Sequence, residues 1–387
     1  MNKHSKRRNF VLLSVILFPH FTIRHVSVAV LIVLTLLVSV SMSPVQGMII
    51  NATYDSTVTS QTNAAQIESA FADAIQTFED LYTNPITVDV TVHYQTGIGL
   101  AQSTTELTGN PAYSDLVNAL SASATTDEDS NSITSLPAND PTPSGTWWIA
   151  NAQAKALGPI GGFDYVQSFP DGDGSIYFES TNSYTFDPTN RAVMKKYDFI
   201  GVAEHELSEV LGRGYGLGTL NGGYIPYDLF RFIGHGVRSL STSDTNVYFS
   251  INDGVTSLKD FNIPGNGGDI QDWASGATPD SFDAFASPGD ELVLSSADLT
   301  ALDILGYNLN FHPPNLTGTE LTNGTFEINF TNAPGLGFVV LTSTNISLPV
   351  SGWTVLGPAT ENPAGQYHFT DSSSPSDQKR FYRISLP

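Results

Sequence analysis

Residues 198–213 read DFIGVAEHELSEVLGR, and the spacing of their apolar side chains predicts a helix. His205 and Glu209 are four residues apart, so they share one face of this helix, one turn from each other. Both side chains can bind a metal ion. Glu206 stands beside His205, where a metal-dependent hydrolase keeps its general base. Gly212 follows at a position where helices often end with a positive φ angle.

A plain solvated helix is the alternative interpretation of this segment, because glutamate is a good helix former. The composition favours the metal site. Only 14% of the residues in the chain are charged, yet this mostly apolar segment carries glutamates at positions 204, 206 and 209. Carboxylates without partners in a buried helix would be costly, so a bound cation is the simpler explanation.

Length and charge set the broad class of the protein. A chain of 387 residues is long enough for two domains. The net charge of −22 argues against nucleic acid and anionic membrane surfaces as main partners, and it favours a soluble chain, which we expect to be a monomer. The chain has no cysteine, which leaves core size and bound calcium as sources of stability.

The N-terminus has the pattern of an export signal. Basic residues are followed by two apolar runs, Phe10–Pro19 and Val26–Met42, and Gly47 is a small residue suited to cleavage. We therefore predict a signal peptide over residues 1–47, a secreted extracellular protein, and no membrane association once the signal is removed. A retained membrane anchor is the alternative.

Hydrophobic periodicity predicts the main elements that follow. These are the helices Asn63–Tyr82, Tyr113–Leu120 and Trp147–Leu157, and the strands Ile86–Tyr94 and Ser175–Glu179. Residues 121–144 are polar and predict a long surface loop. After Gly212 the chain is glycine-rich and irregular until about residue 290, and a capped helix is expected from Ser295 to Gly306.

The C-terminal part differs in character. Residues 312–315 contain two prolines and predict a linker. Residues 316–387 carry short alternating strands between turns, which predicts a small all-β sandwich. This segment resembles a module found at the ends of secreted bacterial proteins, on the marks Ser343-Thr-Asn-Ile, Trp353-Thr and Phe381-Tyr-Arg383. Trp353 either binds the face of a sugar or belongs to the core.

The chain from about residue 48 to 310 resembles metzincin-type secreted bacterial metalloproteases. Some members carry His-Glu-x-x-Glu-x-x-Gly-Arg, as residues 205–213 do, in place of His-Glu-x-x-His-x-x-Gly. Leu294–Gly306 is similar to the closing helix of matrix metalloproteinases and serralysins. The resemblance implies an α+β catalytic domain over residues 48–311, with a twisted mixed sheet, helices, and Ser175–Glu179 as the edge strand that pairs with an extended peptide.

The third metal ligand departs from that pattern. It would fall at Tyr215, whose neutral phenol is a poor ligand, and no methionine follows the helix to form the usual turn. Asp228 is favoured instead, because it lies in an Asp-Leu-Phe-Arg segment similar to one in the same bacterial group. His235 is the alternative ligand, and Asp228 paired with Arg231 is the structural alternative.

The resulting hypothesis is a secreted metal-dependent endopeptidase that acts on proteins or peptides. His205, Glu209 and Asp228 would hold zinc, and Glu206 would be the general base. A carboxylate in place of a histidine makes the site harder, so manganese, calcium or iron would compete better with zinc. The alternatives are a catalytically inactive zincin-fold binding protein and a surface or carbohydrate-binding adhesin.

A second ion is expected in the acidic turn Asp171–Gly174. This turn resembles the structural calcium loop that precedes the edge strand in matrix metalloproteinases, with carboxylate oxygens from Asp171 and Asp173. A plain tight turn is the alternative.

Overall fold

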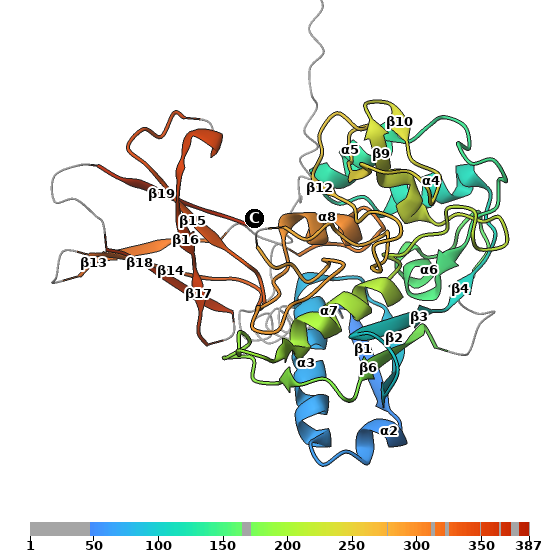
Figure 1. The fold of residues 1–387 in the computed structure, drawn as a ribbon. Helices are drawn as coiled ribbons and strands as arrows, with labels where there is room; N and C mark the ends of the chain where they lie inside the picture. Colours follow the sequence, from blue (N-terminus) through green and yellow to red (C-terminus); the bar gives the residue numbers. More distant parts are fainter. Residues whose placement is uncertain are drawn as a thin grey trace, which may run out of the picture. The chain divides into compact units, whose positions relative to one another are not determined.

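The computed structural model describes residues 47–164, 172–276, 278–310, 314–321, 325–348, 350–363, 365–372 and 379–386. These residues form helices and several sheets, so the α+β class is confirmed (Figure 1). The predicted signal peptide lies outside the described residues except for Gly47. Within the described ranges, no helix combines the length and the apolar character needed to cross a membrane.

A mixed four-stranded sheet forms the base of the fold, in the order β1-β2-β6-β3 (Figure 1). Strands β1 (Ile49–Tyr54), β2 (Thr87–Gln95) and β6 (Gly174–Glu179) are parallel, and β3 (Ala101–Thr105) is antiparallel to β6. The prediction that Ser175–Glu179 is an edge strand is therefore wrong, because β6 lies between β2 and β3. The edge strand is β3, whose sequence AQSTT has no apolar alternation to reveal it.

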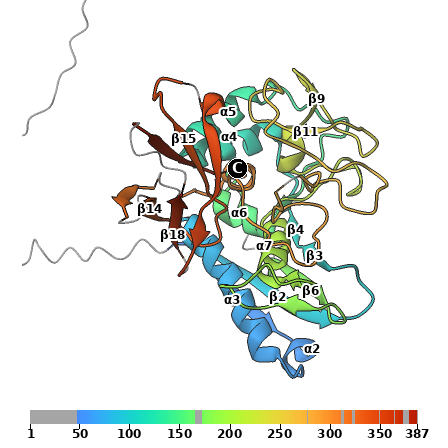
Figure 2. The same ribbon diagram turned by 60° about the vertical axis from the view of Figure 1, so that its left-hand side comes forward.

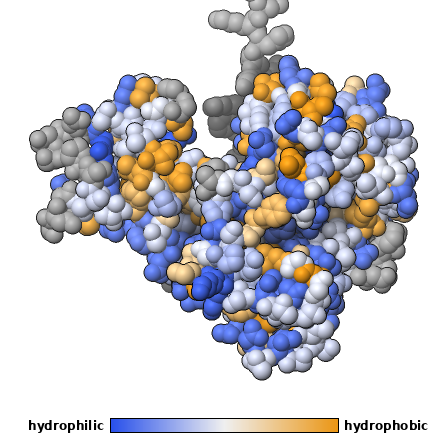
Figure 3. Space-filling model, viewed as in Figure 1, coloured by the Kyte–Doolittle hydropathy of each residue, from blue (hydrophilic) through white to orange (hydrophobic). Residues whose placement is uncertain are grey.

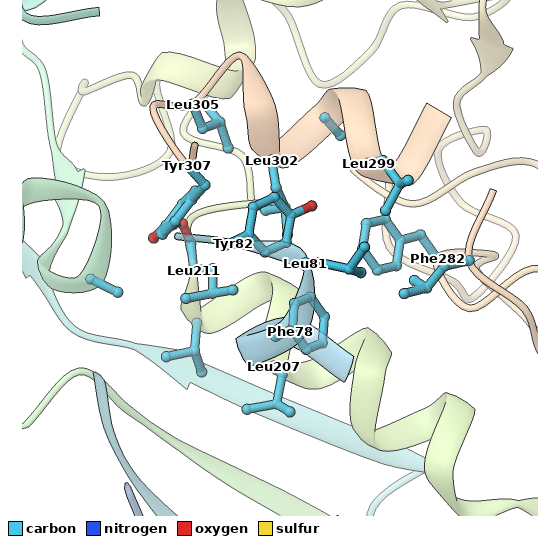
Figure 4. Packing of buried hydrophobic residues seen from close by; sticks show 14 of the residues in the cluster. Phe78, Leu81, Tyr82, Leu207, Leu211, Phe282, Leu299, Leu302, Leu305 and Tyr307 are labelled. Carbon is cyan, nitrogen blue, oxygen red and sulfur yellow. Dashed lines mark hydrogen bonds between the residues drawn. The ribbon is translucent and has the colours of Figure 1, made fainter. Parts of the chain in front are cut away.

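Helices α3 (Ala64–Leu81) and α7 (Phe199–Val210) lie side by side next to this sheet (Figure 2). Figure 3 shows one face of the molecule, on which hydrophilic residues alternate with apolar patches. The buried apolar residues form the hydrophobic core. Figure 4 shows Tyr82 and Leu81, at the end of α3, close to Leu299 and Leu302 of α8 (Ser296–Asp303), with Phe78 nearer to α7. The end of α3 thus packs between α7 and α8.

Two predicted segments differ from the structure. The expected loop 121–144 contains helix α5 (Asp127–Ser135), which begins with a capping box between Thr126 and Asp129. Its mostly polar sequence hides the helical period. The expected helix Trp147–Leu157 starts with a short strand, β5 (Ile149–Ala150), and only then continues as α6 (Asn151–Leu157).

The remaining elements between residues 56 and 260 are short, apart from α4. They are α2 (Ser56–Thr59), β4 (Leu107–Thr108), α4 (Tyr113–Ser123), β7 (Tyr184–Thr185), β8 (Tyr197–Asp198), η2 (Pro226–Phe230), β9 (Arg231–Gly234), β10 (Val237–Arg238), β11 (Tyr248–Phe249) and β12 (Lys259–Asp260). The last four form a small sheet in the order β10-β9-β11-β12, so the region expected to be irregular contains its own sheet.

The C-terminal part contains two antiparallel sheets, and a stacked ring pair, Phe326 on Tyr382, joins them with centroids 5.1 Å apart. Their elements are β13 (Thr317–Glu320), β14 (Phe326–Thr331), β15 (Val339–Ser343), η3 (Val350–Gly352), β16 (Thr354–Pro358), β17 (Thr360–Glu361), β18 (Gln366–Asp371) and β19 (Phe381–Ser385). The boundaries at 312–315 stay a prediction, since residues 311–313 lie outside the described ranges.

Candidate metal centre

Helix α7 is fixed at both ends, which sets the direction of its polar face. Asp198 occupies the N-cap position, but its carboxylate pairs with Arg191 rather than with the helix backbone. At the other end, the Tyr307 hydroxyl donates to the carbonyl of Leu211 at 2.8 Å. Gly212 follows with φ of 110°, a conformation that glycine adopts without strain, so the chain turns away as predicted.

Three potential ligand atoms converge beside this helix. His205 Nε2 lies 3.6 Å from Glu209 Oε1 and 3.5 Å from Asp272 Oδ1. All three residues place a ligand atom within 4.8 Å of the others. In tetrahedral coordination at the usual zinc–ligand distances, neighbouring ligand atoms lie about 3.3 Å apart. The separations of His205 Nε2 from Glu209 Oε1 and from Asp272 Oδ1 are close to this spacing.

The two ligands on α7 are oriented by outer hydrogen bonds. His205 Nδ1 lies 2.9 Å from the carbonyl oxygen of Ser281, which can only accept, so Nδ1 carries a proton and Nε2 faces the carboxylates. Glu209 accepts a hydrogen bond from Ser103 Oγ at 2.6 Å and one from Gln271 Nε2 at 2.8 Å. Such partners are typical of metal ligands, because they fix the ligand before the ion arrives.

Arg213 supplies a buried positive charge behind the two carboxylates. Its side chain has no solvent exposure, and Nη1 lies 2.6 Å from Asp272 Oδ1 while Nη2 lies 3.7 Å from Glu209 Oε1. The guanidinium is held by Ser208 Oγ at 2.7 Å and stands over the Phe282 ring at 4.4 Å. One histidine, two carboxylates and this arginine carry the same net charge as two neutral histidines and one carboxylate. Arg213 thus offsets the charge that Glu209 adds.

Glu206 lies beside the three donors but is not one of them. Its residue is 4% exposed, and Oε2 has no hydrogen-bond partner within the described part of the chain. Burial, followed by the neighbouring Glu209 carboxylate, raises the pKa of Glu206 well above its usual range. A raised pKa makes the carboxylate a stronger base, which suits a group that accepts a proton from water.

These residues open into a pocket of about 420 Å³. His205, Glu206, Glu209 and Asp272 line it together with residues 99–103, which lead into strand β3. One edge of β3 pairs with β6, and the other pairs with no strand among the described residues. The pocket therefore joins the candidate metal centre to a free strand edge.

Asp228 does not join this group, which corrects its assignment as third ligand. Its carboxylate accepts hydrogen bonds from the backbone N–H groups of Gly216, Leu217 and Ile225 at 2.9–3.2 Å. Burial raises its pKa to about 6 against these bonds. Asp228 is buried as expected, but its partners are peptide groups of the loop after α7. Asp272, not Asp228, lies beside His205 and Glu209.

The two alternative ligands also lie outside the group. His235 does not belong to the three-residue cluster and is exposed between β9 and β10, and Tyr215 does not line the pocket. Asp272 belongs to an acidic, glycine-rich segment, residues 267–273, whose composition was the only sequence signal that could have pointed to it.

The predicted calcium turn is only partly described. Asp171 lies outside the described residues. Asp173 is buried, and its Oδ2 accepts the Lys155 ammonium at 2.5 Å and the Asp89 N–H at 2.7 Å. Lys155 thus already provides a cation for Asp173, and calcium at this turn stays a prediction.

No protein-family model, no curated protein and no solved structure matches this chain.

Proposed function

We propose that this protein is a secreted metal-dependent endopeptidase of metzincin type. The observation that carries the proposal is the convergence of His205, Glu209 and Asp272 in one pocket with Glu206, beside the free edge of β3. Glu206 is the general base of the hypothesis drawn from sequence, and Asp272 replaces Asp228 in the ligand set.

The donor set would hold zinc or another divalent transition metal. When bound there, such an ion would polarise a carbonyl group and acidify water. Glu206 would accept a proton from the attacking water on a carboxylate oxygen and pass it to the leaving amine nitrogen. Arg213 would keep Glu209 and Asp272 in place while these proton transfers occur.

A polypeptide is the substrate that suits this pocket. The unpaired edge of β3 offers backbone N–H and C=O groups to an extended chain, which can add to the sheet as a further strand. The net charge of −22 argues against nucleic acid as a substrate. Export through the N-terminal signal and a monomeric state are part of the same proposal.

A catalytically inactive binding protein is the second candidate, and one observation favours it. With His205 protonated, His205 and Arg213 balance the charges of Glu209 and Asp272 without any metal. The same four groups could therefore form a closed ion cluster rather than a metal centre.

Metal analysis combined with hydrolysis separates the two candidates. The purified secreted chain is treated with a chelator, reloaded with zinc or manganese, and analysed for bound metal and for cleavage of an unstructured protein such as casein. The endopeptidase proposal expects one tightly held ion per chain and cleavage that depends on it. A chain that holds the ion without cleaving supports the binding protein, and a chain that holds none contradicts the metal centre.

A further inference from the structure

The pocket at the metal centre carries an excess of negative charge. Five of its lining residues are carboxylates, namely Glu206, Glu209, Asp269, Asp272 and Asp283. None of the described lining residues is a lysine or an arginine. In the metal-loaded site, the ion and Arg213 together balance Glu206, Glu209 and Asp272. Two carboxylates, Asp269 and Asp283, are left without an assigned role.

Asp283 is the buried member of this pair. Its residue is 7% exposed, and its Oδ1 has no hydrogen-bond partner among the described residues. Burial, and after it the carboxylate of Asp280, raise the pKa of Asp283 to about 7, since Lys259 opposes them only in part. The Lys259 ammonium is itself paired with Asp280. Backbone hydrogen bonds from Asp280 and Gly276 also stabilise the Asp283 carboxylate, but no side chain among the described residues donates to its Oδ1.

Asp269 adds a second charge to the same pocket from an exposed position. The pocket also has apolar lining residues, which include Leu100, Tyr197, Val202, Ala284, Phe285 and Leu292. Apolar walls and unassigned carboxylates together suit a side chain with a long hydrocarbon stem and a cationic head. Lysine and arginine are the protein side chains of this kind.

The charge of the whole protein acts in the same direction. A chain with a net charge of −22 attracts basic peptides and repels acidic ones over distances comparable to the Debye length. A pocket lined by one sign of charge between apolar walls concentrates that field.

We propose that the pocket selects peptides with a lysine or arginine side chain next to the scissile bond, with Asp283 and Asp269 as the recognising carboxylates. This selectivity rests on the proposed endopeptidase function, because it concerns the substrate of the same site. Asp283 would accept a charge-assisted hydrogen bond from the cationic head at the wall of the pocket.

Binding to a non-hydrolysing variant tests the proposal without depending on catalysis. The zinc-loaded Glu206→Gln protein is titrated with fluorescent peptides that differ at one position, occupied by lysine, leucine or glutamate, and binding is followed by anisotropy. We expect the lysine peptide to bind on the order of tenfold more tightly than the leucine peptide, and the glutamate peptide to bind most weakly. Asp283→Asn and Asp269→Asn, each added to Glu206→Gln, should move the lysine-to-leucine ratio toward one.

Glu128→Gln is the matched control, because it removes one exposed negative charge that does not line the pocket. It should leave the ratio unchanged. If Asp283→Asn does not fold, the exposed Asp269→Asn still reports on the selectivity. Equal affinity for all three peptides, or a ratio that Glu128→Gln lowers as much as the two pocket variants, overturns the proposal. Failure of wild-type protein to cleave the lysine peptide that it binds would count against the endopeptidase function instead.

Discussion

Helix α7 carries two buried arginine–carboxylate clusters, and they differ in what they can do. Near its start, Arg191 pairs with Asp198 at 2.8 Å and with Glu204 at 3.5 Å. Near its end, Arg213 pairs with Asp272 and lies close to Glu209. Both clusters allow a mostly apolar helix to bury acidic side chains, since each arginine supplies the compensating charge.

Only the second cluster has the parts of a reactive site. It includes a histidine whose Nε2 faces two carboxylates, a further acid in Glu206, and access to a pocket of about 420 Å³. The acids of the first cluster do not line that pocket, and Arg191 is tied to the carbonyl of Leu292 at 2.8 Å. A buried acid paired with arginine is thus a structural device, and it is the histidine and the open pocket that give the second cluster its chemistry.

The largest expected difference between the clusters is in catalysis. Glu206→Gln should lower peptide hydrolysis by on the order of 10²–10⁴-fold, because it removes a positioned proton acceptor, and should leave the metal content unchanged. Glu204→Gln, two residues earlier, should retain hydrolysis, because Glu204 belongs to the other cluster. Casein cleavage and metal analysis of both variants give the result. Similar losses in the two variants would show that the clusters are not distinct.

Removal of each arginine should separate the clusters by their response to metal. Arg191→Met and Arg213→Met should each destabilise the metal-free protein by about 3–5 kcal/mol, since both leave buried carboxylates without a counter-charge. Zinc should restore much of the loss in Arg213→Met, because it brings positive charge beside Glu209 and Asp272, and should restore little in Arg191→Met. Denaturant unfolding with and without zinc measures this. An equal response to zinc would contradict the placement of the ion.

Zinc affinity should distinguish the two candidate aspartates. Asp272→Asn removes a direct ligand, so it should weaken zinc binding by more than the roughly 10–100-fold loss typical of an outer partner. Asp228→Asn should change zinc affinity little and should instead lower stability, because Asp228 holds three backbone N–H groups of a loop. Competition with a fluorescent chelator gives both affinities, and the reverse ranking would restore Asp228 as the ligand.

Metal binding should release protons. This effect is smaller than the preceding ones, but it reports directly on the groups at the metal centre. Burial opposes a charge on His205, but the Asp272 carboxylate and a hydrogen bond with Glu209 raise its pKa to about 10. His205 therefore holds a proton at pH 7 in the metal-free protein, and zinc would displace it, while the raised pKa of Glu206 favours the protonated form of that carboxyl as well. Zinc affinity should accordingly rise with pH.

Calorimetry of zinc binding in buffers with different ionisation enthalpies counts these protons. The Glu206→Gln variant should release fewer protons than the wild type, because its amide does not titrate. The same count in both proteins would mean that Glu206 does not lose its proton when the ion binds.

Elements with a strong apolar period could be predicted closely from the sequence. Strand β2 and helix α3 begin and end within one residue of their predicted bounds, because regular spacing of valine, phenylalanine and isoleucine marks their buried faces. Strand β3 and helix α5 have polar sequences, and other segments of the chain hold them in place. Both elements depend on tertiary contacts, which the local sequence pattern does not reveal.

The residues of the candidate site also differ in how well the sequence could predict them. The helix motif placed His205, Glu206 and Glu209 together, because their relation is local. Asp272 lies 63 residues after Glu209 within an irregular segment, so only the folded chain brings them together. The Asp-Leu-Phe-Arg segment predicts Asp228 as a ligand, but the partners of this buried aspartate are backbone N–H groups, which can satisfy a carboxylate as a metal can.

Two hydroxyl groups on β3 fix the position of this strand relative to helix α7. Ser103 and Thr105 lie two residues apart and so point to the same side of the strand, and they donate to the carboxylate and to the carbonyl oxygen of Glu209. A peptide that paired with the free edge of β3 would therefore have a fixed position relative to Glu209. The cut would then fall at a constant offset from the peptide residue that pairs with Ser103, whatever the sequence of the peptide, and lengthening β3 by one residue would move the cut along the substrate.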